Sequence, residues 1–371
     1  MAGQKAPLSD PVLSVRKLTT RLSIGNEAHA VVDELSFDLY PGRTLAIVGE
    51  SGCGKSMTAL SLLRILPHPP ALPSEGEVVY QGKNLLEISN REMRDIRGAK
   101  IAMIFQDPMS ALNPVYTIGY QLAEVAAMHL GLYDDEAEAR CVQALEEVQI
   151  TDAVERLNDY PHQLSGGMKQ RVMIAMALMC EPDVLIADEP TTALDVTVQK
   201  QVLGLIADLQ RKKGMALLLI THDMGVVAEV ADEVIVMYAT QAVERGDVYN
   251  IFDNKAHPYT QGLFNSLPTA ADRDGKPLDC IEGTVPALGQ MPSGCHFHPR
   301  CPHAMPKCQK GSVPAFDLKA PGHQATCWLH SPEDSDIGIS IEEQNTVTMA
   351  PGMERTLVNK AGQSDCQQGR M

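Results

Sequence analysis

Short apolar runs alternate with segments at helical spacing along most of the chain. Runs typical of buried strands lie at 43–50 (RTLAIVGE), 100–107, 184–188, 216–223 and 233–238. Apolar residues at helical spacing lie at 56–66 (SMTALSLLRIL), 168–179, about 196–212 and about 224–231. Strands that alternate with helices predict an α/β fold with a mostly parallel core sheet covered on both faces.

Other regions depart from this alternation. Residues 12–40 are β-branched and apolar and are broken by GNE at 25–27, which predicts an N-terminal antiparallel β region. The stretch from about 117 to 160 is mostly helical in pattern. Near 256 the character changes, and Pro, Gly, Cys and His become frequent from 285 to 327, as expected of a small loop-rich extension. The polar end, 331–371, opens with five acidic residues and no basic one, and we predict that it is disordered.

Composition narrows the functional classes. The 371 residues contain no run of 18 apolar residues and no apolar region of a secretory signal, so we expect a cytoplasmic chain without a membrane span of its own. The formal charge of −16 makes the chain a poor candidate for binding nucleic acid through phosphate contacts.

The segment GESGCGKS predicts a phosphate site. Gly49-x4-Gly54-Lys55-Ser56 lies between a predicted strand and a predicted helix, the context that this pattern requires. Successive backbone N–H groups of such a loop cradle phosphate oxygens, Lys neutralises the β- and γ-phosphates, and Ser binds Mg²⁺. The predicted nucleotide-binding residues here are Gly49, Glu50, Ser51, Gly52, Cys53, Gly54, Lys55, Ser56 and Met57.

Polar residues at strand ends supply candidate catalytic groups. Asp188 and Glu189 end a buried strand, where adjacent carboxylates are costly unless a metal or substrate uses them. We assign Asp188 to Mg²⁺ and Glu189 to general-base activation of the attacking water. Gln106 is a candidate ligand of Mg²⁺ or of that water, and His222 a candidate contact of the γ-phosphate. Taken alone, each of the last two is a weak signal.

Together these segments resemble the motif set of ATP-binding cassette (ABC) ATPases over residues 12–245. The matching segments are GESGCGKS, Gln106, LSGGM at 164–168, DVLIADEP at 183–190, Ala193-Leu194-Asp195 and His222. The resemblance implies a P-loop NTPase fold, ATP and Mg²⁺ as ligands, and catalysis by Glu189, His222, Gln106 and Lys55. It implies that Ser165, Gly166 and Gly167 bind the γ-phosphate held by an opposite subunit, with Asp195 at the dimer seam.

A narrower resemblance extends to about residue 330. YPHQLSGGMKQRVMIAMAL at 160–178, DEPTTALDVTVQ at 188–199 and HPYTQGLFNSLP at 257–268 resemble the ATPase subunits of oligopeptide and dipeptide importers. This implies a peripheral subunit on the cytoplasmic face of the cell membrane, docked on two permeases that an extracytoplasmic solute-binding protein feeds. It implies a second ATPase subunit, with a heterodimer favoured over a homodimer, and no nucleic acid.

Two alternatives differ in cargo or class. Nickel and glutathione importers use similar ATPases, and the cargo is gripped by other subunits. A soluble ABC ATPase acting on nucleic acid or ribosomes is disfavoured, because such proteins tend to have two cassettes or long heptad arms. This chain has one cassette and no sustained heptads between Lys55 and Ser165.

One departure from the family pattern concerns adenine. These ATPases usually stack adenine on an aromatic residue upstream of the phosphate loop, but no Phe, Tyr or Trp occurs in residues 1–36. Leu22 takes that place, so we expect adenine to rest on an aliphatic surface, with a loss of about 1 kcal/mol of stacking.

Four of the nine cysteines crowd into one segment. Cys295, Cys301, Cys308 and Cys327 favour a metal centre, since disulfides are rare in cytosolic proteins. The spacing lacks the paired CxxC of many zinc sites, and the importer family carries this cysteine pattern. We therefore predict a [4Fe–4S] cluster in preference to zinc.

These observations divide the chain into four parts. We predict an N-terminal segment at 1–11, an ABC ATPase domain at 12–255 with a helical subdomain at about 107–163, a C-terminal extension with the four-cysteine metal site at 256–330, and the tail at 331–371.

Overall fold

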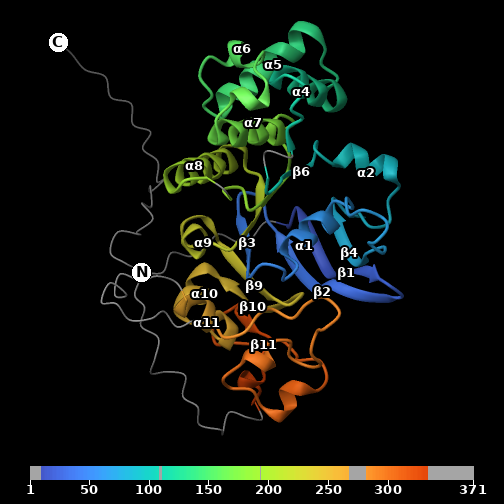
Figure 1. Ribbon diagram of the computed structural model, residues 1–371, viewed down its shortest axis with the longest axis vertical. Helices are drawn as coiled ribbons and strands as arrows, with labels where there is room; N and C mark the ends of the chain where they lie inside the picture. Colours follow the sequence, from blue (N-terminus) through green and yellow to red (C-terminus); the bar gives the residue numbers. More distant parts are fainter. Residues whose placement is uncertain (1–9, 108–110, 193, 267–280, 333–371) are drawn as a thin grey trace, which may run out of the picture.

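The computed structural model describes residues 10–107, 111–192, 194–266 and 281–332. Figure 1 shows a helical region at one end of the long axis, the core sheet in the middle and the C-terminal segment (orange to red) at the other end. The predicted tail lies outside the described residues except for 331 and 332, and the N-terminal segment except for 10 and 11.

The core is an eight-stranded sheet. Its strand order is β11-β12-β10-β9-β3-β8-β7-β6. The bounds are β3 Thr44–Val48, β6 Ile101–Ile104, β7 Val184–Asp188, β8 Ala216–Thr221, β9 Glu233–Tyr238, β10 Gln241–Asp247, β11 Phe316–Asp317 and β12 Gln324–Ala325. The five strands from β9 to β6 pair in parallel, and β10, β12 and β11 add antiparallel pairs. The predicted mostly parallel sheet is confirmed.

The strands of the parallel part are buried on both faces, which explains their unbroken apolar sequences. All residues of β3, β7 and β8 are buried. Covering helices are α1 Lys55–Leu62, α7 Gly166–Leu178, α8 Val196–Lys213, α9 Met224–Val230, α10 Val248–Asp253 and α11 Pro258–Asn265. The predicted helix at 56–66 is shorter, because Arg64 adopts a left-handed conformation (φ 52°).

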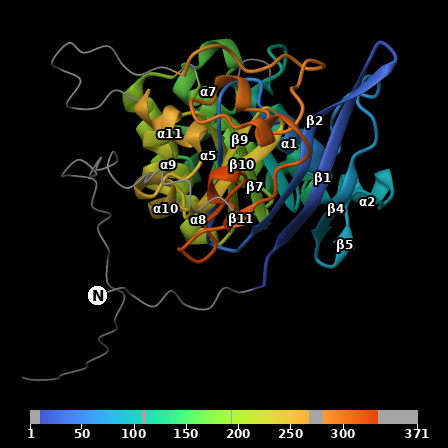
Figure 2. The same cartoon turned by 90° about the horizontal axis from the view of Figure 1, so that it is seen from below.

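A second, antiparallel sheet confirms the N-terminal β region. Its order is β2-β1-β4-β5, with β1 Leu13–Ile24, β2 Glu27–Leu39, β4 Glu75–Tyr80 and β5 Lys83–Asn84. Figure 2 shows this sheet along one side of the core. We did not predict β4, β5 or the short helix α2 (Asn90–Ile96), which begins at a capping box formed by Ser89 and Glu92.

The helical region is also confirmed. It contains α4 Ile118–Val125, a π-helical turn Ala126–Leu130, α5 Asp134–Glu147, α6 Ala153–Arg156 and a 3₁₀ turn Pro161–Gln163. Its buried residues, such as Leu122 and Leu145, share one hydrophobic cluster with Ile174 of α7 and Leu205 of α8. The region is therefore packed onto the core through α7. In the described ranges, no helix is long and apolar enough to cross a membrane.

The C-terminal extension is joined to the edge of the core sheet. Its β12 pairs with β10 at Ala325 opposite Glu244. Glu244 is fully buried and accepts hydrogen bonds from the backbone N–H groups of Ala256 (2.9 Å) and His257 (2.8 Å). Its Oε1 lies 2.8 Å from His323 Nε2. The extension thus continues the sheet, and the domain boundary at 255/256 stays a prediction.

Candidate functional site

The phosphate loop follows β3 and ends where α1 begins. Gly49 has φ 152°, and a Cβ there would lie 2.2 Å from the Met237 carbonyl oxygen. Gly54 has φ 102°, and its Cβ would lie 2.3 Å from the carbonyl oxygen of Val31. Only glycine fits these positions. Lys55, 5% exposed, donates from Nζ to the carbonyl oxygens of Gly49 (2.9 Å) and Glu50 (3.0 Å).

Two of the three predicted Mg²⁺ ligands lie in contact. Ser56 Oγ donates to Asp188 Oδ1 at 3.0 Å, across 132 residues of sequence. Asp188 is 4% exposed at the end of β7. Burial raises its pKa, the bond from Ser56 opposes this shift, and the charge of Glu189 adds to it. A divalent cation at this pair favours the ionised carboxylate. The third predicted ligand, Gln106, bonds instead to Glu189.

The predicted catalytic residues Gln106, Glu189 and His222 meet beyond the ends of β6, β7 and β8. Glu189 Oε2 accepts from Gln106 Nε2 and from Thr192 Oγ1, each at 2.9 Å. Its Oε1 lies 3.2 Å from His222 Nδ1, on a side chain that is 65% exposed. Glu189 has φ 45°, a costly conformation that is typical of functional sites.

The partners of Glu189 keep its carboxylate ionised. Burial raises its pKa, but the hydrogen bonds from Thr192 and His222 outweigh burial, so the pKa is lowered overall. An ionised carboxylate at neutral pH is what a general base requires. We did not predict Thr192. Thr192 lies in DEPTT, only three residues after Glu189, and a hydroxyl this close in sequence to a candidate catalytic carboxylate is the signal that was available.

The LSGGM segment opens α7 and lies beside the start of α8. Ser165 is the N-cap residue of α7, and its Oγ accepts from Met168 N. Asp195 is the N-cap residue of α8 and accepts from Val198 N at 3.0 Å. A Cβ on Gly167 would lie 2.9 Å from Val198 Cγ1, so the two helix starts are in close contact.

The adjacent starts of α7 and α8 face the surface. Ser165, Gly166 and Asp195 are exposed, and Val196 is 72% exposed. Among the hydrogen bonds of the described residues, none joins Ser165 or Asp195 to the phosphate loop. Ala193 lies outside the described residues. Within one chain, therefore, the structure brings the phosphate loop, Asp188, Glu189, Gln106 and His222 together, and leaves the LSGGM segment apart from them.

Leu22, the predicted adenine contact, has an unexpected neighbour. Leu22 on β1 pairs directly with His29 on β2, and cross-strand partners lie on the same face of a sheet. His29 is two residues before Val31, whose carbonyl approaches Gly54 of the phosphate loop. His29 is not aromatic in the Phe, Tyr or Trp sense of the family pattern, but its imidazole ring is flat and lies next to Leu22 in the sheet.

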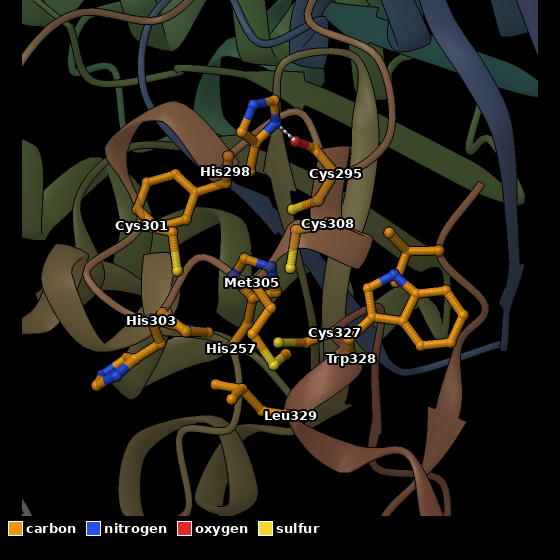
Figure 3. A pocket seen from close by; sticks show the side chains of 13 residues that line it. His257, Cys295, His298, Cys301, His303, Met305, Cys308, Cys327, Trp328 and Leu329 are labelled. Carbon is orange, nitrogen blue, oxygen red and sulfur yellow. Dashed lines mark hydrogen bonds between the residues drawn. The ribbon is translucent and has the colours of Figure 1, made fainter. Parts of the chain in front are cut away.

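The four cysteines line one small cavity in the extension, near the 3₁₀ turns His298–Arg300, Pro306–Gln309 and Trp328–His330. Figure 3 shows the sulfur atoms of Cys295, Cys301, Cys308 and Cys327 pointing into the same space. Burial raises the pKa of Cys295, of Cys301 to about 11 and of Cys327 to about 12. Without a cation these thiols stay protonated at neutral pH.

Two buried donors also line this cavity. Among the described residues, His257 Nε2 and Trp328 Nε1 find no hydrogen-bond partner. His257 is 1% exposed, and burial lowers its pKa to about 4, so the ring is neutral. Its Nδ1 accepts from Tyr259 N at 3.0 Å, which places the ring proton on Nε2. Four thiols and two residues with buried N–H groups therefore line one small cavity.

The side chains are not, however, arranged as a finished metal site. In the described ranges, no group of three or more His, Cys, Asp or Glu side chains is placed so that it could hold a metal ion. The expectation of a formed centre at the four cysteines is therefore not met, although the donor set is present.

Three features together define an ABC ATPase. They are the phosphate loop after β3, the Asp–Glu pair at the end of β7, and the exposed LSGGM segment at the start of α7. The family model "ABC transporter" matches residues 32–192, and the model "Oligopeptide/dipeptide transporter, C-terminal region" matches residues 243–308. The chain belongs to the family of ABC transporter ATP-binding proteins that carry this C-terminal region, and it is an ATP-hydrolysing subunit. Both resemblances inferred from the sequence are confirmed.

Full-length relatives support this assignment. The chain is 48% identical to "Probable peptide ABC transporter ATP-binding protein y4tR" of Sinorhizobium fredii, over 88% of this chain and 98% of that protein. It is 49% identical to "Dipeptide transport ATP-binding protein DppD" of Bacillus subtilis, over 86% and 95%. Among solved structures, the dimeric ATP-binding cassette MJ0796 with ADP and phosphate is similar, with a TM-score of 0.56, 25% identity, and coverage of 64% of this chain and 98% of that one.

Proposed function

We propose that this chain is the ATP-hydrolysing subunit of a membrane importer for dipeptides and oligopeptides. The observation that carries the proposal is the match along almost the whole of relatives named for peptide and dipeptide transport, including the C-terminal region of that transporter class. These relatives favour a peptide cargo over the alternatives, nickel and glutathione. A soluble role on nucleic acid is disfavoured by the same match.

In this proposal the residues at the sheet edge act on MgATP. Lys55 and the loop 49–57 hold the phosphates, Ser56 and Asp188 bind Mg²⁺, and Gln106 contacts the metal or the attacking water. Glu189 takes a proton from that water, and His222, beside Glu189, contacts the γ-phosphate. Leu22 and His29 form the surface on which adenine rests.

We propose that a second ATPase subunit completes the site. The exposed starts of α7 and α8 would supply Ser165, Gly166, Gly167 and Asp195 to the nucleotide of the partner, since a small-residue helix start is an anion site. A heterodimer is favoured over a homodimer. ATP then favours the closed pair and hydrolysis reopens it.

The helical region offers a surface for the permeases. Val115 (69% exposed), Tyr116 (44%), Tyr120 (56%) and Met128 (70%) are exposed apolar residues of this region, and the rings of Tyr116 and Tyr120 stack at 4.5 Å. Such a surface fits short amphipathic helices of two permease subunits, fed by an extracytoplasmic solute-binding protein. In this proposal the chain lies on the cytoplasmic face of the cell membrane.

Transport by the reconstituted complex tests the function. We expect vesicles containing the two permeases, both ATPase subunits and the binding protein to accumulate labelled dipeptide with ATP. A complex carrying Glu189→Gln is the matched control and should not accumulate peptide. Accumulation of nickel or glutathione, with none of peptide, would overturn the cargo assignment. Co-purification with RNA rather than with permeases would overturn the assignment to a membrane importer.

We also propose that the four cysteines hold a metal–sulfur centre, with [4Fe–4S] favoured over zinc. The shared cavity and the unpaired N–H groups of His257 and Trp328 support this. The centre would cross-link the extension, and the two N–H groups would donate to its sulfur atoms.

Protein purified without oxygen should contain iron and sulfide, and the Cys301→Ser variant should contain neither. Cys180→Ser, outside the cavity, is the control; zinc in place of iron would overturn the choice.

A further inference from the structure

One side chain of the extension reaches the phosphate loop. Arg300 Nη1 donates to Glu50 Oε2 at 2.9 Å, across 250 residues of sequence. Glu50 is the second residue of GESGCGKS, and its own carbonyl accepts from Lys55 Nζ. Arg300 therefore contacts the residue that also binds the phosphate-binding lysine.

The guanidinium group is fixed on all sides. Nε donates to the Glu282 carbonyl (2.8 Å), Nη2 to the carbonyls of Ile281 and Gly283 (3.3 Å each), and Nη1 also to Tyr238 Oη (3.4 Å). The Arg300 side chain is 8% exposed, and that of Glu50 is 27% exposed. Because every N–H group of the guanidinium is used and the Arg300 side chain is buried, this ion pair differs from a mobile pair on the surface.

A second contact holds the same loop residue. Glu50 N donates to Tyr259 Oη at 2.9 Å, and Tyr259 lies on α11 of the extension. The ring of Phe297 packs against Tyr238 (5.1 Å) and Tyr259 (5.4 Å) and is 2% exposed. The turn that carries Arg300 is thus anchored in a buried aromatic cluster beneath the phosphate loop.

Charge makes this contact relevant to nucleotide binding. An unpaired Glu50 carboxylate would lie beside a loop that receives a triphosphate, and like charges at short range in a partly buried site repel strongly. Arg300 pairs with that carboxylate at 2.9 Å and so offsets its charge. We propose that Arg300 is a positioning residue for nucleotide binding, through which the C-terminal extension sets the affinity of the phosphate loop for ATP.

The same turn adjoins the cysteine cavity. Arg300 directly precedes Cys301 and follows Cys295 by five residues, and both cysteines line that cavity. If the proposed metal centre forms, it fixes both ends of the segment 295–301. The role of Arg300 rests on the phosphate loop alone and does not require the centre.

The test is a set of nucleotide affinities, measured by fluorescence titration with a labelled ATP on the purified full chain. We expect Arg300→Gln to raise the Kd for ATP about tenfold, as the loss of one neutralising charge implies. KM for ATP should rise with it while kcat changes little, since Glu189 and its partners are untouched. Arg300→Lys keeps the positive charge but loses the forked guanidinium group, so its Kd for ATP should lie between those of the wild type and of Arg300→Gln.

A double variant tests whether Arg300 acts on nucleotide affinity through the charge of Glu50 or only stabilises the extension. In the double variant Arg300→Gln with Glu50→Gln, no unpaired carboxylate faces the phosphates, so we expect most of the affinity to return. The matched control is Arg43→Gln, which removes a half-buried pair with Glu233 (3.4 Å) at the opposite end of β3. It should leave the Kd unchanged.

Two results would overturn the proposal. One is wild-type affinity in folded Arg300→Gln; the other is a loss of affinity that Glu50→Gln does not recover, which would mean that Arg300 only stabilises the extension. Thermal melting of each variant establishes folding. Failure of the transport function would appear differently, as wild-type protein that binds ATP but drives no peptide accumulation.

Discussion

Two glutamates of the core sheet, Glu189 directly after β7 and Glu244 on β10, each have three hydrogen-bond partners but differ in exposure. Glu189 has three side-chain partners, remains 14% exposed, and has a left-handed backbone. Glu244 joins two backbone N–H groups and His323, and its side chain is fully buried. The first carboxylate is partly accessible to solvent, whereas the second holds the extension on β10. Solvent access, not the number of hydrogen bonds, distinguishes the carboxylate that we propose as the general base from the one that holds the extension.

The largest expected effect is on catalysis. Glu189→Gln removes the proton acceptor while the amide keeps a similar shape, so we expect ATP hydrolysis to fall by about 10²–10⁴-fold. The melting temperature should change little, and ATP should remain trapped in a closed dimer. Steady-state phosphate release and size-exclusion chromatography with ATP check both results. Wild-type hydrolysis in this variant would show that another group is the base.

At Glu244 we expect a loss of stability rather than a loss of the hydrolytic group. Glu244→Ala leaves His323 and two backbone N–H groups buried without their acceptor, which should destabilise the protein by about 3–5 kcal/mol. We expect a clear drop in melting temperature by calorimetry. A stable variant that has lost ATPase activity would reverse the roles assigned to the two carboxylates.

A smaller effect is expected where adenine would rest. His29→Ala removes the flat ring beside Leu22, and we expect ATP affinity to weaken by about 1 kcal/mol, close to fivefold. Inorganic tripolyphosphate has no base, so its affinity should stay constant. Equal weakening for both ligands would show that His29 acts on the phosphate loop instead.

The smallest effect is expected at an exposed pair. Arg211 and Asp208 on α8 are 72% and 51% exposed, and pairs of this kind contribute about 0–1 kcal/mol. Asp208→Asn should therefore leave the melting temperature almost unchanged. A drop as large as that of Glu244→Ala would contradict the view that burial separates the two cases.

Much of the nucleotide edge could be predicted from the sequence. The glycine loop at 49–54, Asp188 with Glu189, and His222 each lie at the end of an apolar strand, and parallel strands place such ends on one edge of the sheet. The local pattern therefore fixes both the residue types and their common location. Thr192, three residues after Glu189, has a weak local signal, whereas the position of His29 beside Leu22 depends on the pairing of β1 with β2.

The extension shows what the sequence alone could not provide. Its cysteines were evident as a group, but neither the unpaired N–H groups of His257 and Trp328 nor the contact from Arg300 to Glu50 has a local signal. Pairing of β12 with β10 likewise joins segments about 80 residues apart. The sequence determined the chemistry of the loop and strand ends, because those depend on neighbouring residues. Only the tertiary structure decided which distant side chains meet, because burial and charge pairing are set by the packing of the whole chain.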